Sequence, residues 1–124
     1  MRDKRCRAWD KATETYLYSD KFPSMWMFYK ELEHRGIRHF ETEDYTGLLD
    51  KNGKEIYEGD ILCHWNNLHT HNGAGVVVYK APGFYLDQSK GNRNAILKLL
   101  ASCYVLCNKS IVIGNLYENK DLLK

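Results

Sequence analysis

The sequence has few of the features that mark a secreted or membrane protein. Its four cysteines form no Cys-x-x-Cys pair, and no apolar run approaches the length of about 18 residues that a spanning helix needs. The first ten residues are rich in charge and hold no apolar segment typical of a signal peptide. We therefore expect a cytoplasmic protein with reduced thiols and no contact with membranes.

The sequence also lacks the short motifs of the common enzyme classes. It contains no Gly-x-Ser-x-Gly nucleophile motif and no glycine-rich loop that would bind phosphate. The formal net charge of +2 is too small to indicate nucleic-acid binding by itself. From these absences we expect no enzyme, no catalytic residue and no cofactor.

What the chain does contain is the composition of an ordinary globular protein. Its 124 residues are 44% hydrophobic and 27% charged, which predicts one domain over residues 1–124 with a core of its own. The aromatic residues are abundant, with nine tyrosines against only two prolines. A composition of this kind suits packed strands.

Short strands dominate the pattern. Residues 4–9 alternate, with Cys6 and Ala8 on one face and Arg5, Arg7 and Trp9 on the other, which predicts a strand with one buried face. Other strand-like segments are separated by turns rich in glycine, and they lie at residues 15–18, 55–57, 61–65, 76–79, 84–86 and 110–117. The pattern predicts a mainly β fold, a small half-open barrel or sheet of short antiparallel strands that resembles an SH3-like barrel.

Two helices are expected beside the strands. Residues 23–35 begin with Pro23, which suits a first helical position, and end at Gly36, which suits the left-handed position after a helix. Residues 94–102 are apolar and could form a short helix or a buried strand, and we favour the helix. Between the strands, Asn52-Gly53 predicts a type I′ hairpin turn, in which both central residues have positive φ.

Three blocks of the sequence together resemble the YopX family. They are Cys6-Arg7-Ala8-Trp9-Asp10, the segment Tyr45-Thr46-Gly47-Leu48-Leu49-Asp50-Lys51-Asn52-Gly53-Lys54-Glu55-Ile56-Tyr57-Glu58-Gly59-Asp60-Ile61, and Val112-Ile113-Gly114-Asn115-Leu116-Tyr117-Glu118-Asn119. The resemblance implies a mainly β fold, an origin in a phage or prophage genome and self-association, with no established activity. It also implies that the cytoplasm in question is that of a bacterial host cell. The chain departs from the family pattern at Asp44, where Gln is common, and at Lys120, where Pro is common. The blocks consist largely of turn residues, which specify a fold and name no reaction.

An accessory protein that acts through protein contacts is the function that the sequence favours. Apolar side chains recur at helical spacing in the predicted helix, and such a stripe exceeds what a small sheet covers. We expect this stripe to pack in the core or to contact a second copy or another phage or host protein; its residues are Met25, Trp26, Phe28, Tyr29 and Leu32.

Two other function classes remain open. A nucleic-acid-binding module would use Arg5 and Arg7 against phosphates, with aromatic side chains stacking on bases. A metal-dependent enzyme would use the histidines of one polar loop, His64, His69 and His71, or the clustered acids Glu55, Glu58 and Asp60. Exposed loop histidines and turn-capping acids explain the same residues without a site, so we expect no metal.

Overall fold

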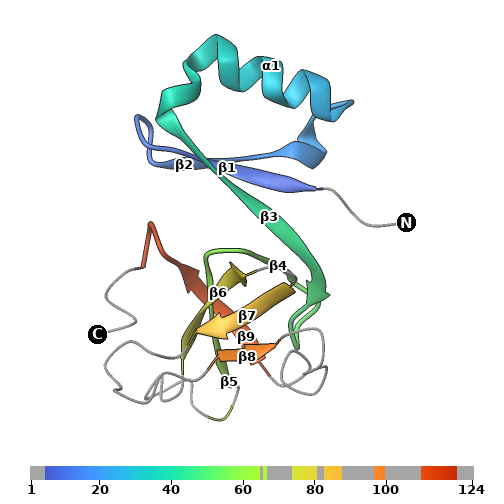
Figure 1. Ribbon diagram of the computed structural model, residues 1–124, viewed down its shortest axis with the longest axis vertical. Helices are drawn as coiled ribbons and strands as arrows, with labels where there is room; N and C mark the ends of the chain where they lie inside the picture. Colours follow the sequence, from blue (N-terminus) through green and yellow to red (C-terminus); the bar gives the residue numbers. More distant parts are fainter. Residues whose placement is uncertain are drawn as a thin grey trace. The chain divides into compact units, whose positions relative to one another are not determined.

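The computed structural model describes residues 5–64, 66, 74–80, 83–87, 97–99 and 110–119. Within these residues the chain forms antiparallel strands, one α-helix and two 3-10 turns (Figure 1). Their bounds are β1 (Cys6–Asp10), β2 (Thr15–Tyr18), η1 (Ser19–Lys21), α1 (Met25–Arg35), η2 (Ile37–His39), β3 (Phe40–Leu49), β4 (Glu55–Tyr57), β5 (Asp60–His64), β6 (Gly75–Lys80), β7 (Gly83–Asp87), β8 (Leu97–Leu99) and β9 (Ser110–Asn115). The prediction of a mainly β, half-open arrangement with one helix near residues 23–35 is confirmed.

The chain divides into two compact units. The N-terminal unit is Met1–Tyr45 and the C-terminal unit is Thr46–Lys124. The strand order is β2-β1-β3-β4 in one sheet and β8-β7-β6-β5-β9 in the other. The boundary falls inside β3, and the single domain expected over residues 1–124 stays a prediction. In the part of the chain that is described, no helix is long and apolar enough to cross a membrane.

In the N-terminal unit, α1 covers one face of the central strand β1 (Figure 1). Phe28 and Leu32 are fully buried and pack with Cys6 and Ala8, as the alternation of β1 predicts. The opposite face of β1 is buried as well, which the alternation does not predict. Arg7 is 4% exposed, because β1 lies between β2 and β3 and the Arg7 side chain pairs with a neighbouring strand.

The turn between β1 and β2 is held by an aspartate. Asp10 Oδ1 accepts hydrogen bonds from the backbone N–H of Ala12 at 2.9 Å and of Thr13 at 3.4 Å. The turn then places Glu14 at φ +56°, in the left-handed region that side chains other than glycine rarely adopt. The bond from Glu14 N–H to Asp10 O, at 2.8 Å, closes the turn around this conformation.

In the C-terminal unit, β5 lies in the interior of the five-stranded sheet and is buried on both faces. Leu62 packs in one cluster with Ile56, Val77 and Leu86, while Ile61 packs on the other side with Val76 and its neighbours. The segment expected as a second helix near residues 94–102 is a strand where it is described. Leu97–Leu99 forms β8 and pairs with β7. The sequence did not distinguish a helix from a strand here, because a short apolar segment shows no clear period.

The loop between β3 and β4 is built on Asp50, and here the type I′ prediction is wrong. Gly53 N–H donates to Asp50 O at 3.0 Å, and Asp50 N–H donates to Lys54 O at 2.8 Å. Gly53 has φ +80°, but Asn52 does not have a positive φ. This is the pattern of a three-residue loop with a glycine bulge. The Asp50 carboxylate favours it, because Oδ1 accepts from the N–H groups of Asn52 at 2.9 Å and Lys54 at 2.8 Å.

The same carboxylate reaches a strand far along the chain. Asp50 Oδ2 accepts from Val112 N–H at 3.0 Å, and Lys51 N–H donates to Ser110 O at 2.8 Å. Strand β9 pairs with β5 along its other edge, so the loop supplies partners to the edge that β5 leaves open. Asp50 is only 5% exposed, and a buried carboxylate needs such donors.

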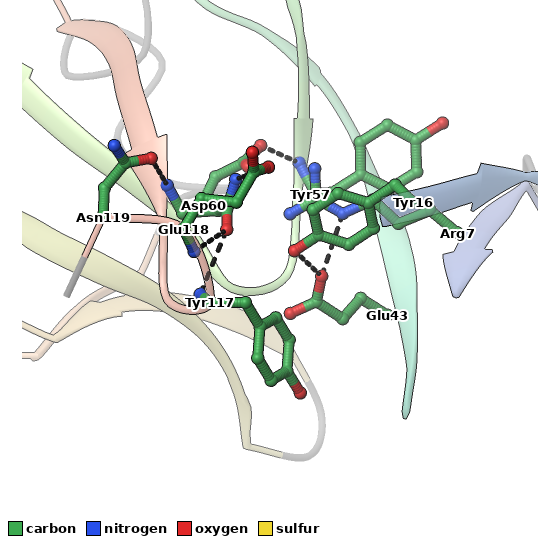
Figure 2. A network of polar contacts seen from close by, with 9 residues as sticks. Arg7, Tyr16, Glu43, Tyr57, Asp60, Tyr117, Glu118 and Asn119 are labelled. Carbon is green, nitrogen blue, oxygen red and sulfur yellow. Dashed lines mark hydrogen bonds and ion pairs between the residues drawn. The ribbon is translucent and has the colours of Figure 1, made fainter. Parts of the chain in front are cut away.

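The corner after β9 is closed by two asparagines (Figure 2). Asn115 Oδ1 accepts from the N–H groups of Tyr117 at 3.0 Å and Glu118 at 2.9 Å, and Asn119 Oδ1 accepts from Asn115 N–H at 3.2 Å. A Cβ atom at Gly114 would lie 2.5 Å from Asn119 Oδ1. Glycine is therefore required at position 114 by the side chain that closes the corner.

Replacing Asp50 by alanine should destabilise the protein by about 2–4 kcal/mol, because three backbone N–H groups lose their charged acceptor. Urea unfolding followed by circular dichroism measures the change. Asp20 is an exposed aspartate in η1 and serves as the control, for which we expect a loss below about 0.5 kcal/mol. Equal effects of the two substitutions would contradict the role assigned to Asp50.

Replacing Glu14 by glycine should stabilise the protein by about 0.5–1 kcal/mol, because glycine adopts positive φ without steric cost. Glu14→Ala is the matched control, since alanine removes the same carboxylate and keeps the strained backbone. Thermal unfolding should rank glycine above both the wild type and alanine, and a glycine variant less stable than alanine would show that the strain is absent.

Candidate functional site

The ends of α1 determine which of its side chains reach solvent. The N-cap is Ser24, whose Oγ accepts from Met27 N–H at 3.2 Å, so Pro23 precedes the helix instead of occupying its first position. The helix ends at Gly36, which has φ +103° as expected for a residue after a helix. A helix fixed between these residues turns Phe28 and Leu32, four residues apart, toward β1.

The structure divides the apolar stripe of α1 into a buried part and an exposed part. Phe28 and Leu32 are core residues with 0% exposure, so assigning them to a partner surface is corrected here. Met25 is partly buried and packs against the same core. Trp26 is 68% exposed and Tyr29 is 42% exposed. Of the five predicted residues, these two present large surfaces to solvent.

A hollow lies beside Trp26 on the outer side of α1. Its apolar lining comes from Phe22, Trp26 and Met27, and its polar lining includes Lys30, Glu31 and His34. Met27 is 45% exposed and is absent from the predicted stripe. The sequence does contain a signal for the exposure of Met27, because this apolar residue falls outside the four-residue spacing of the buried Phe28 and Leu32. We call the exposed Trp26 and Met27 together with this hollow the α1 face.

The charges along the α1 face have both signs and pair along the helix. Lys30 Nζ lies 3.8 Å from Glu33 Oε2 and 5.4 Å from the centre of the Trp26 ring. Arg35 Nε donates to Glu31 Oε2 at 2.7 Å. These pairs are at least partly exposed, so they add little to stability and leave charge available to a partner.

Tyr29 connects the exposed side of α1 to the core. Its hydroxyl lies 3.9 Å from Cys6 Sγ, and its ring packs at 5.4 Å, edge to face, against Phe28. Burial raises the pKa of the Cys6 thiol and also that of Tyr29. Both groups are therefore protonated near neutral pH, and the contact between them is structural.

Arg7 does not lie where a phosphate contact requires it. Arg7 Nε donates to Glu43 Oε1 at 2.9 Å, and Tyr16 Oη donates to the same oxygen at 2.9 Å (Figure 2). The guanidinium carbon lies 4.2 Å from the centre of the Tyr16 ring. Arg5 is partly exposed, with its guanidinium 4.4 Å from the Tyr45 ring. The nucleic-acid hypothesis thus loses Arg7, which is a buried partner of Glu43.

The residues considered for metal binding do not converge where they are described. Among those residues, no three of the types His, Cys, Asp and Glu are grouped so that they could hold an ion. Asp60 is 2% exposed, and its Oδ2 accepts from Tyr57 N–H at 2.8 Å across the bend between β4 and β5 (Figure 2). His69 and His71 lie outside the described residues, whereas His64 ends β5.

Comparison with known proteins identifies the family. The sequence matches the family described as YopX protein over residues 5–124, nearly the whole chain. The chain belongs to the YopX family. The crystal structure of protein EF1440 from Enterococcus faecalis is similar to this YopX protein, with a TM-score of 0.60, 19% sequence identity and 100% of both chains covered. That likeness shows a shared fold, and no curated protein matches the sequence.

Neither the family description nor the name of the similar Enterococcus faecalis protein states an activity. The blocks that carry the family resemblance contain the corners described above, with Asp50 between β3 and β4, Asp60 after β4, and Asn115 after β9. In this YopX protein their side chains bond to backbone amides. These three blocks therefore maintain the framework, and none of them contains a residue of α1.

Breaking the buried ion pair from one side should be costly. Arg7→Met leaves the Glu43 carboxylate buried without its cation, and we expect a loss of about 3–5 kcal/mol. Adding Glu43→Leu should recover at least half of that loss, because the uncompensated charge is removed. Lys11→Met is the matched control, since Lys11 pairs with Glu41 in an exposed position of the same unit and should change stability by less than about 0.5 kcal/mol.

Urea unfolding of the wild type and these variants measures the differences. A double variant as unstable as Arg7→Met alone would show that the stability comes from the packing of the Arg7 side chain and not from its charge.

Proposed function

We propose that this YopX protein is a non-enzymatic accessory protein of a phage or prophage, which acts through protein contacts and associates with itself. The observation that carries the proposal is the α1 face. Trp26 is 68% exposed, although burying a tryptophan is among the most favourable contacts that an interface can make. The phage or prophage setting rests on the family resemblance.

Exposure of this kind supports an interaction role for a physical reason. Trp26 and Met27 lie next to each other on the helix and beside a hollow lined by Phe22, so the apolar surface is continuous. Single exposed apolar residues are common on protein surfaces, whereas a continuous patch with a polar rim is typical of partner sites. The charged side chains of Lys30 and Glu31 form such a rim.

Self-association should depend on concentration and on Trp26. Sedimentation velocity of the untagged protein over about 1–300 µM should show reversible association, since a patch on one short helix makes a small interface. Trp26→Glu should raise the dissociation constant at least tenfold, because it removes the exposed indole ring that the contact would bury.

Leu49→Glu is the matched control. Leu49 is a large apolar residue with 50% exposure in the C-terminal unit, and its substitution should leave association unchanged. A wild type that stays monomeric over the whole range would refute self-association.

A further inference from the structure

The chain passes between its two compact units once, at the peptide bond between Tyr45 and Thr46. This bond lies in the interior of β3, a strand of ten residues whose two ends belong to different units (Figure 1). Before the bond, residues Phe40–Asp44 pair with β1, and Tyr45 N–H donates to Arg5 O at 3.0 Å. This half of β3 is therefore held by partners of the N-terminal unit.

After the bond, β3 is held by the C-terminal unit. Strand β4 lies along the edge of β3 opposite to β1. The Thr46 hydroxyl donates to Ile56 O of β4 at 2.7 Å and accepts from Leu48 N–H at 3.1 Å. The two halves of one strand are thus fixed to different units, and a side-chain hydroxyl supplies hydrogen bonds at the point where the strand changes partners.

The residue that follows Thr46 has conformational freedom and space. Gly47 is exposed and has φ +84°, a conformation that residues other than glycine rarely adopt. Apart from its chain neighbours, no heavy atom of the described residues lies within 4 Å of the point that a Cβ at Gly47 would occupy. A glycine inside a strand often marks a bend or a bulge. The backbone at Gly47 can therefore rotate without displacing packed atoms.

We propose that Gly47 is a hinge between the two units and that the Thr46 hydroxyl holds this hinge closed. When the bonds to Ile56 O and Leu48 N–H break, rotation at Gly47 gives the units other relative orientations. Each of these bonds is neutral and contributes only about 1 kcal/mol, so they open and close repeatedly.

The hinge gives the protein a means of regulation. Helix α1 belongs entirely to the N-terminal unit, so its exposed side changes direction relative to the five-stranded sheet when the hinge opens. A partner that contacts both units would bind some orientations better than others and shift the population toward them. The inference does not rest on the proposed function, because it concerns the connection within one chain.

Residual dipolar couplings from a tag on one unit measure the motion. A lanthanide tag is attached through a non-natural azide side chain at Asp20, an exposed residue of the N-terminal unit, so the native cysteines stay unmodified. The alignment of each unit is fitted from its own backbone amides. In a rigid molecule both units have the same alignment, whereas motion at the hinge reduces that of the C-terminal unit. We expect an alignment ratio, C-terminal over N-terminal, below one.

Two substitutions of Thr46 test the hydroxyl. Thr46→Val removes the hydroxyl and keeps the shape of the side chain, so both hydrogen bonds are lost. The alignment ratio should then fall roughly twofold below that of the wild type, because the open orientations gain population. Thr46→Ser is the matched control, since serine keeps the hydroxyl and should leave the ratio near the wild-type value.

A pair of glycine substitutions tests the position of the hinge. Gly47→Ala should move the alignment ratio toward one, because a Cβ reduces the number of backbone conformations open to this residue. Gly53→Ala is the matched control. Gly53 has φ +80° and, among the described residues, equally free surroundings, but it lies in a loop within the C-terminal unit. Its substitution strains the backbone in the same way and should leave the ratio unchanged.

The outcomes separate this inference from the proposed function. Equal alignment of the two units in the wild type would overturn the hinge and leave the proposed protein contacts untouched. Equal ratios for Thr46→Val and Thr46→Ser would show that the hydroxyl does not hold the hinge. A Gly47→Ala ratio no closer to one than that of Gly53→Ala would remove Gly47 as the hinge. Amide chemical shifts within each unit serve as the folding control for every variant.

Discussion

The framework of this protein depends on carboxylate and amide side chains that accept hydrogen bonds from backbone N–H groups at its corners. Asp50 is the main example, because its two oxygens serve three amides in two parts of the chain. Oδ1 determines the form of the β3–β4 loop, and Oδ2 joins that loop to β9. Strand β9 therefore has hydrogen-bond partners along both of its edges, which protects this edge of the sheet from pairing with other chains.

The N-terminal unit shows how burial on one side of a helix creates a surface on the other. Phe28 and Leu32 fill the space above Cys6 and Ala8, and their spacing fixes the rotation of α1. Trp26 is two residues before Phe28, so the same rotation turns it outward. On the opposite face of β1, the pairing of Arg7 with Glu43 removes a cation from the surface. The core therefore determines where the apolar and charged surfaces lie.

Much of the fold could be predicted from the sequence because its signals are local. The alternation around Cys6 and Ala8 and the glycine after α1 each specify a local conformation. The burial of Arg7 could not be predicted in this way, since it depends on Glu43 lying directly opposite Arg7 in the β1–β3 register. The loop at Asn52-Gly53 differed from expectation because the Asp50 side chain offered its amides another acceptor.

The candidate site was predictable only in part. Helical spacing identifies apolar residues but does not show which of them face the core. Phe28 and Trp26 were therefore assigned to one surface, although Phe28 is buried and Trp26 is exposed. Met27 was omitted because it breaks the spacing, and that break is the property that places it outside the core. The strand at Leu97–Leu99 illustrates the same limit, since three residues are too few to show a period.

Hydrogen exchange of the wild-type protein, followed by nuclear magnetic resonance, tests the central claim most directly at the amide of Val112. If the Asp50 carboxylate accepts this N–H as described, the amide is protected to a degree comparable with the amides of the β5 ladder. The loop amides of Asn52 and Lys54 are protected with it. Exchange of all three amides at the rate of an unstructured chain would contradict the account.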